Sequence, residues 1–402
     1  MADDDDDGLT ERQHFGTILR AYDNYRKWAL QKIARLEHDY RRLSEQHWRL
    51  LKLSDKLAAM RAAVEQNANI IAHLVQPHRN YVGWEDDPTF VPVDDDYGGT
   101  RFVPAASAGY VDDGDMEKVQ STLKQFVREW GEEGEAERSQ AHGPLLEALQ
   151  AGLPLTQGTE ARVLLPGAGL GRLAWEVAQL GYTAQGCEFS YFMLLASNFI
   201  MNTLQEDSVT VHPWVLQTCN TRSTTEQVRP AVVPSPAAPS SIGAERNLSM
   251  CAGDFLEVYR DQFYRWEAII TCFFIDTAKD VTRYLERISQ MLVPGGLWIN
   301  IGPLLWHWAD MRNEVSVELT WEELRALILS YGFTIEREEW VRCGYTNNCA
   351  SMYRMEYDSI FFVARTKSGG ETESAALHQP TVDPLERHSR CDTSAGEKPN
   401  AR

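Results

Sequence analysis

Apolar residues recur at helical spacing along the first part of the chain. Between Glu11 and about His73 no proline interrupts the sequence, and the steps between successive apolar residues are three, four or seven. The apolar positions are Phe15, Leu19, Tyr22, Ala29, Ile33, Leu36, Tyr40, Leu43 and Leu50. This pattern predicts helices that pack either on the rest of the same chain or against a second copy in a homodimer.

The pattern changes twice before the middle of the chain. From Pro77 to Asp115 prolines, paired glycines and an acidic run indicate a loop. A short amphipathic helix is predicted next, and a second helical pattern covers roughly residues 134–151. The apolar face of the amphipathic helix consists of Val119, Leu123, Phe126, Val127 and Trp130.

From Ala161 onward short apolar runs alternate with helical patterns. This alternation predicts an α/β fold with a mostly parallel, Rossmann-like sheet. No clear helix separates the last two runs, so we expect an antiparallel pair at one edge. Residues 222–247, rich in Pro, Ser and Ala, predict a mobile surface insertion. The apolar runs lie at 162–165, 183–187, 209–212, 267–274, 297–301, 333–341 and 359–364.

These patterns divide the chain into four parts. Residues 1–10, with five consecutive aspartates, are predicted to be a disordered acidic N-terminus. Residues 11–115 form the helical region and loop, and residues 116–366 form the α/β domain. The polar segment 367–402 is predicted to be a disordered tail.

The amino-acid composition limits the kinds of molecule that the protein is expected to bind. The 402 residues carry a formal net charge of −19, which disfavours nucleic acid and anionic membranes as partners. No apolar run reaches the length of a membrane span, and the N-terminus lacks the pattern of a secretory signal. The seven cysteines are widely spaced without a C-x-x-C pair, so we expect reduced thiols and no metal site. The chain is interpreted as cytoplasmic, with the nucleus as a second compartment.

A glycine-rich turn is the strongest local signal. The apolar run that ends at Leu165 leads into Gly167-Ala168-Gly169-Leu170-Gly171, and an amphipathic helix follows. Glycine lets a ligand lie against the backbone, and the helix start supplies free N–H groups. A dinucleotide site would carry glycine at 172, where this chain has arginine. The spacing suits S-adenosylmethionine, although a plain strand–helix turn is the simpler alternative.

Acidic residues follow the next strands. Glu188 ends the second run, where a carboxylate can accept both ribose hydroxyls. Asp254 and Phe255 offer an acid and an aromatic ring for the adenine amino group and the adenine face. Together with the glycine turn, these segments resemble Rossmann-like methyltransferases.

Asp276 is the candidate catalytic residue. It follows the apolar run 267–274 beside two phenylalanines, and a carboxylate in apolar surroundings needs a partner such as a cationic substrate. The alternative is that Asp276 caps a helix at 277–291. His307 follows the next strand between Trp306 and Trp308, whose rings would suit a flat substrate. Tyr357 precedes the last strand and is close enough in sequence to reach the same edge.

Longer motifs make a more specific resemblance. The segments LLPGAGLGRLAWEVAQLGYTAQGCEFSYFMLLASNF, AGDF, ITCFFIDTA and PGGLWINIGPLLWHW are similar to the carnosine N-methyltransferase family, as is STLKQFVREWGEEGEAER. The resemblance covers about Gln120 to Thr366. It implies methyl transfer from S-adenosylmethionine to the imidazole of carnosine (β-alanyl-histidine), which gives anserine.

The resemblance also implies residue roles. Gln125, Arg128 and Cys272 match cofactor-binding positions of the family, together with Gly167, Gly169, Glu188, Asp254 and Phe255. Asp276, His307 and Tyr357 match substrate-binding positions. The chain departs from the family at Met355, where a tyrosine is expected. Two alternatives stay open: a methyltransferase of histidine in proteins or peptides, and a catalytically inactive methyltransferase-like interaction module.

Overall fold

The computed structural model describes residues 11–78, 90–94, 100–104, 112–156, 160–204, 208–236 and 247–367. The predicted acidic N-terminus and the predicted tail beyond 367 lie outside the described residues. Within the predicted loop 77–115, strands β1 (Phe90–Asp94) and β2 (Thr100–Pro104) pair as an antiparallel hairpin.

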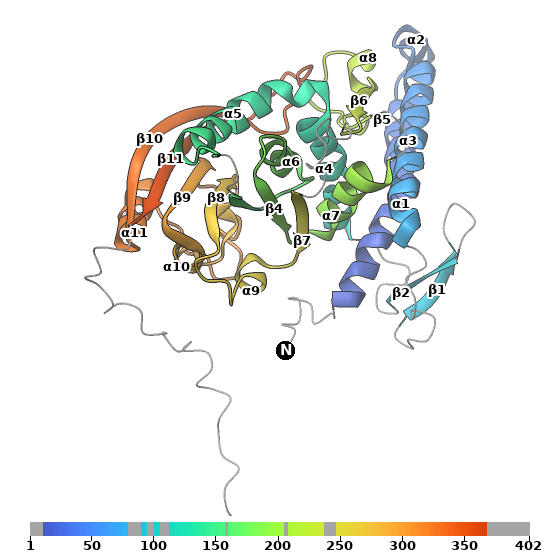
Figure 1. Ribbon diagram of the computed structural model, residues 1–402. Coiled ribbons are helices and arrows are strands. Elements are labelled where there is room, and N and C mark those ends of the chain that lie inside the picture. Colours follow the sequence, from blue (N-terminus) through green and yellow to red (C-terminus); the bar gives the residue numbers. More distant parts are fainter. Residues whose placement is uncertain are drawn as a thin grey trace, which may run out of the picture.

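A seven-stranded sheet forms the centre of the described part of the chain (Figure 1). Its order is β10-β11-β9-β8-β3-β4-β7, and all of its strands except β11 run in the same direction. The predicted antiparallel pair at one edge is confirmed: it consists of β10 and β11, with β11 as the reversed strand. The bounds are β3 (Arg162–Pro166), β4 (Thr183–Glu188), β7 (Leu248–Ala252), β8 (Trp266–Cys272), β9 (Leu292–Gly302), β10 (Phe333–Gly344) and β11 (Glu356–Thr366).

Helices cover both faces of this sheet, because successive strand residues point to opposite sides. Val163 packs with α5 (Glu135–Gly152) and α6 (Arg172–Gln179) on one face. Leu164, the next residue, packs with the helices of the other face, which are α9 (Phe255–Val258), α10 (Val281–Met291) and α11 (Trp321–Ser330). The sheet is therefore buried on both sides, which explains its near-continuous apolar runs.

The N-terminal helices form a hairpin beside the sheet (Figure 1). The predicted helical stretch is divided into α1 (Glu11–Tyr40), the short α2 (Glu45–Leu50) and α3 (Leu53–Val75). Their apolar residues share one core with α4 (Asp113–Trp130) and α7 (Tyr191–Asn198), which continues into the π-helical turn η4 (Phe199–Thr203). The heptad positions from Phe15 to Tyr40 thus pack on the same chain, whereas Leu43 and Leu50 are exposed. A homodimer through these helices stays a prediction.

The structure corrects the expected strand at 209–212. This segment forms β5 (Ser208–Val211), which pairs with β6 (Ala231–Pro234) in a separate hairpin, with α8 (Thr224–Gln227) between them. Val211 and Val233 are buried against the N-terminal helices, which holds the hairpin away from the central sheet. Consequently part of the segment 222–247, predicted to be mobile, has regular structure; its residues 237–246 lie outside the described residues.

The order in which the strands follow one another along the chain indicates where a ligand-binding crevice lies in the sheet. After β3 the chain builds β4 and β7 on one side, and then returns to place β8 on the other side of β3. In open α/β sheets ligands bind at such a switch point, beyond the carboxyl ends of the strands. The glycine turn and the segment after β8 lie at this point. Among the described helices, none combines the length and apolarity that a membrane crossing requires.

Candidate functional site

The turn after β3 needs glycine for two reasons. Gly167 and Gly169 have φ angles of +69° and +56°, a region that side chains disfavour. A Cβ atom on Gly169 would lie 2.4 Å from Oε1 of Glu129, and one on Gly167 would lie 2.6 Å from the Phe274 ring. Glycine therefore lets the turn adopt this conformation and pack closely against Glu129 and Phe274. That a ligand lies against this backbone stays a prediction.

Glu188 holds this turn from the end of β4. Its Oε2 accepts a hydrogen bond from the Gly169 N–H at 2.8 Å, and its Oε1 accepts one from the Ser190 N–H at 2.8 Å. Burial raises the pKa of the Glu188 carboxyl. The predicted ribose acid thus lies directly beside the glycine turn, where further lone pairs of its oxygens are available to a ligand's hydroxyls.

A second buried acid, Glu129, was not predicted from the sequence. It extends from α4, and both of its oxygens accept the Leu170 N–H, at 3.1 and 3.0 Å; Oε2 also lies 3.4 Å from the Arg172 N–H. Two orphan donors of the turn are thereby satisfied from another helix. The signal was present in the helical spacing, because Glu129 shares the buried face of α4 with Thr122 and Phe126.

Glu129 makes the stability of the protein depend on pH. Burial raises the pKa of its carboxyl from 4.5 to about 7. Between these values the folded protein keeps a proton that the unfolded chain releases, so the free energy of unfolding falls as pH rises, by up to about 3 kcal/mol. We expect Glu129→Gln to lose this part of the slope, measured by denaturant unfolding from about pH 5 to about pH 8. Identical slopes in both proteins would contradict the assignment.

Arg128 and Gln125 lie on the same helix as Glu129, over the crevice. The Arg128 guanidinium is 4.4 Å from the centre of the Tyr345 ring, and its Nε lies 3.7 Å from Oε2 of Glu137 without a hydrogen bond. Gln125 donates a hydrogen bond to the Tyr345 hydroxyl at 3.2 Å. A buried cation with an unpaired N–H is suited to a ligand carboxylate. Tyr345, at the end of β10, was not among the predicted site residues.

The predicted adenine pair lies after β7. Asp254 caps α9, since its Oδ1 accepts the N–H groups of Leu256 and Glu257 at 2.8 and 3.1 Å. The Phe255 ring is 3 % exposed and packs edge-on against Phe274. Because this ring belongs to the core, it offers little open face, and its contact with adenine stays a prediction.

Cys272 ends β8 next to the crevice. The residue as a whole is partly exposed. Its thiol, however, is shielded from water by the surrounding protein, and this burial raises the pKa of the thiol to about 12. The thiol is therefore neutral and not a nucleophile. Within the described residues, no cluster of three or more His, Cys, Asp or Glu side chains is arranged to hold a metal ion.

Asp276 lies in the 3₁₀ turn η6 (Ile275–Thr277) after β8 and is 3 % exposed. Its Oδ2 accepts the Leu305 N–H at 3.0 Å, and its carbonyl accepts the His307 N–H at 3.0 Å. Burial raises the pKa of the Asp276 carboxyl, and nearby His307 opposes this effect. The alternative role as a helix cap is wrong, because Asp280 caps α10.

The segment after β9 places His307 at the entrance of the crevice, where it is exposed. The neighbouring tryptophans are held through their N–H groups: Trp306 donates to the Leu319 carbonyl at 3.2 Å, and Trp308 donates to the Thr277 carbonyl at 2.9 Å. That their rings lie against a flat substrate stays a prediction. Their hydrogen bonds fix the loop that carries His307.

Tyr357, near the start of β11, completes this group. Its hydroxyl donates to the sulfur of Met355 at 3.1 Å, and its ring packs edge-on against Phe273, with the ring centres 6.2 Å apart. Burial raises the pKa of Tyr357, and the charge of nearby Asp276 raises it further. Phe273 has a φ angle of +53°, a conformation that is uncommon outside glycine and often found at functional sites.

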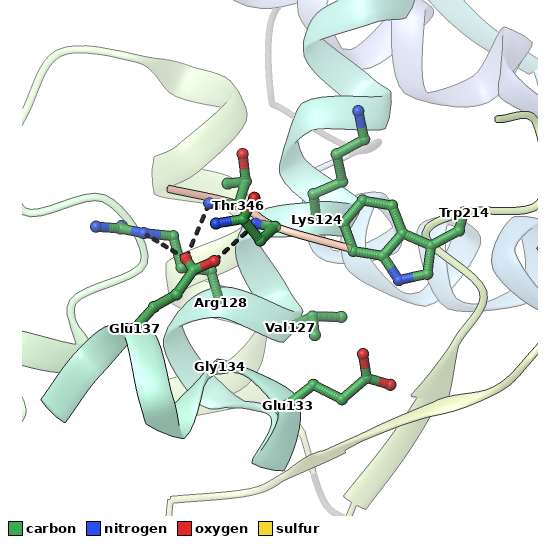
Figure 2. A pocket seen from close by; sticks show the side chains of 9 residues that line it. Lys124, Val127, Arg128, Glu133, Gly134, Glu137, Trp214 and Thr346 are labelled. Carbon is green, nitrogen blue, oxygen red and sulfur yellow. Dashed lines mark hydrogen bonds and ion pairs between the residues drawn. The ribbon is translucent and has the colours of Figure 1, made fainter. Parts of the chain in front are cut away.

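Asp276, His307 and Tyr357 thus lie at one edge of the sheet with the glycine turn. Residues from α4 close this edge from the outside. Figure 2 shows a small hollow lined by Arg128 together with Lys124, Glu137 and Trp214. This hollow is too small for a nucleotide, so the crevice at the strand ends is the candidate site.

Comparisons with known proteins agree with this geometry. The family model of Carnosine N-methyltransferase matches residues 106–368. A Carnosine N-methyltransferase of Mus musculus is 38 % identical over 369 residues, which is 90 % of this chain and 88 % of the relative. Carnosine N-methyltransferase unmet of Drosophila melanogaster is 35 % identical over 372 residues, 88 % of this chain and 80 % of the relative.

A third relative matches a shorter part of the chain. A Carnosine N-methyltransferase of Schizosaccharomyces pombe is 40 % identical over 267 residues, which is 62 % of this chain and 71 % of the relative. The family match covers the sheet, the glycine turn and each predicted site residue from Gln125 to Tyr357. The chain therefore belongs to the carnosine N-methyltransferase family.

Proposed function

We propose that this protein is an S-adenosylmethionine-dependent methyltransferase that methylates the imidazole ring of carnosine. The single observation that carries the proposal is the position of a buried carboxylate, Asp276, at the same sheet edge as a glycine turn held by Glu188. Membership of the family supports the substrate.

The residues of the crevice fit the cofactor. Glu188 would accept the ribose hydroxyls, and Arg128 would pair with the methionine carboxylate. Gly167 and Gly169 let the turn pack closely against Phe274 and Glu129, which would hold its backbone in place beside the ligand. Asp254 would accept the adenine amino group. When bound, S-adenosylmethionine supplies an electrophilic methyl group on a positively charged sulfur.

Asp276 would act on the substrate ring. Its Oδ2 is fixed by the Leu305 N–H, so the carboxylate needs no reorganisation to accept the ring N–H and to face the positive charge that develops on the imidazole. His307 and Tyr357 would hold the remainder of the dipeptide by hydrogen bonds. Most of the rate enhancement would come from holding the nitrogen in line with the methyl carbon.

A substrate panel tests the proposal. The protein is incubated with methyl-labelled S-adenosylmethionine and, in separate reactions, carnosine, homocarnosine, free histidine and a histidine-containing peptide. We expect carnosine to be methylated with a kcat/KM at least about tenfold above that of free histidine, because a dipeptide makes contacts that the amino acid lacks. Mass spectrometry of the product identifies a methylated imidazole.

Two outcomes would contradict the proposal. Preference for the longer peptide would favour a methyltransferase of histidine in proteins or peptides. Absence of S-adenosylmethionine binding by calorimetry would favour an inactive interaction module.

We propose that the protein acts in the cytoplasm, with the nucleus as a second compartment. The free thiols of the described cysteines support a reducing environment. Imaging of the tagged protein tests this proposal.

A further inference from the structure

We propose that Arg229 is a positioning residue for substrate binding, and that the β5–β6 hairpin segment, residues 208–234, serves as an arm that holds the loop between β10 and β11. This loop, residues 345–355, is called the substrate loop below. The inference rests on the proposed function, since it takes Tyr357 as a substrate contact. Nothing in the sequence pattern of the arm indicated such a role.

The substrate loop is a closed unit between two site tyrosines. Tyr345 opens it and contacts Gln125 and Arg128, while Tyr357 follows its end. Asn347 closes the loop: its side-chain amide donates to the Met355 carbonyl at 2.8 Å and accepts the Met355 N–H at 2.7 Å. The positions of both tyrosines therefore depend on where the loop as a whole is held.

One side of the loop is attached to the helices over the crevice. Glu137 of α5 accepts the Thr346 N–H at 2.9 Å and the Asn347 N–H at 2.7 Å, and it also faces Arg128 (Figure 2). The loop and the proposed carboxylate-binding arginine thus share one anchor. This anchor fixes only the first residues of the loop.

The arm holds the other side. Arg229 donates to Oδ1 of Asn348 at 2.9 Å, and its Nε and Nη2 bind both oxygens of Glu133, at 3.1 and 2.6 Å. Main-chain contacts add to this, because the Asn220 carbonyl accepts the Met352 N–H at 2.8 Å. Arg229 is therefore the point at which the arm, the substrate loop and the turn between α4 and α5 meet.

Burial makes this contact stronger than a surface ion pair. The Arg229 side chain is 13 % exposed, and its guanidinium lies 5.8 Å from the centre of the buried Trp214 ring. A bidentate ion pair between arginine and a carboxylate combines charge attraction with a fixed geometry. A lysine cannot reach Glu133 and Asn348 with the same fork, so Arg229→Lys should loosen the loop while it keeps the charge.

Kinetics of variants test the proposal. We expect Arg229→Lys and Arg229→Met to raise KM for carnosine by about tenfold, with kcat and the calorimetric Kd of S-adenosylmethionine each within about twofold of wild type. Asn348→Ala, which removes only the loop side of the contact, should raise KM in the same direction. Arg222→Ala is the matched control, since Arg222 is an exposed arginine of the same arm.

A second measurement does not depend on the substrate. Amide hydrogen exchange of residues 345–355 should be faster in Arg229→Met than in wild type and Arg222→Ala, with exchange in β3 and β8 unchanged. Unchanged exchange in the loop, or equal losses in cofactor and carnosine affinity, would overturn the positioning role. If wild-type protein leaves carnosine unmethylated, the proposed function fails, and the exchange experiment alone decides whether the arm holds the loop.

Discussion

Asp276→Asn is expected to lower kcat for carnosine methylation by about 100- to 1,000-fold and to leave the affinity for S-adenosylmethionine within about twofold of wild type. The substitution removes the negative charge that faces the ring as it becomes positive. An asparagine oxygen can still accept the Leu305 N–H, so the loop that carries His307 keeps its anchor. The cofactor contacts from Glu188 and Arg128 are unaffected.

Asp280→Asn provides the matched control for this variant. Asp280 caps α10 four residues further along, and asparagine caps helices as well as aspartate does. Single-turnover kinetics and calorimetry on both variants separate chemistry from cofactor binding. Turnover near the wild-type value in Asp276→Asn would reject the catalytic role of this carboxylate.

Gly169→Ala is expected to weaken S-adenosylmethionine binding by at least about 30-fold. The added Cβ would lie 2.4 Å from Oε1 of Glu129, and the residue has a φ angle of +56°. The turn must therefore move away from the carboxyl group that accepts the Leu170 N–H, and the hydrogen bond from the Gly169 N–H to Glu188 moves with it.

The control for this variant is Gly143→Ala. Gly143 lies within α5, and a Cβ there would meet no atom within 4 Å, so this substitution should leave binding unchanged and favour the helix slightly. Calorimetric titration of each protein with S-adenosylmethionine measures the difference. Wild-type affinity in Gly169→Ala would show that the turn does not hold the cofactor.

Local patterns in the sequence were sufficient to predict the positions of the glycine turn, of the acid that ends β4 and of the acid that follows β8. Each depends on a strand end, and strand ends are visible as the point where an apolar run stops. The parallel sheet then brings the carboxyl ends of its strands to one edge. For that reason Glu188 and Asp276 were placed without knowledge of any contact between them.

Contacts between segments that lie far apart in the sequence could not be predicted from local patterns. Glu129 meets the glycine turn only because α4 packs across the crevice, and Tyr345 faces Arg128 only because β10 ends there. The prediction that the third apolar run joins the central sheet was wrong for a related reason: Val211 and Val233 are buried against the N-terminal helices. Apolar periodicity reports that a strand is buried, but not against which element.

The most direct test is a crystal structure of the protein with S-adenosylhomocysteine and carnosine. The account predicts the nucleoside against Gly167 and Gly169, with the imidazole between the sulfur and the Asp276 carboxylate and an unprotonated ring nitrogen directed at the sulfur. An imidazole bound elsewhere, or an Asp276 carboxylate turned away from the ring, would contradict it.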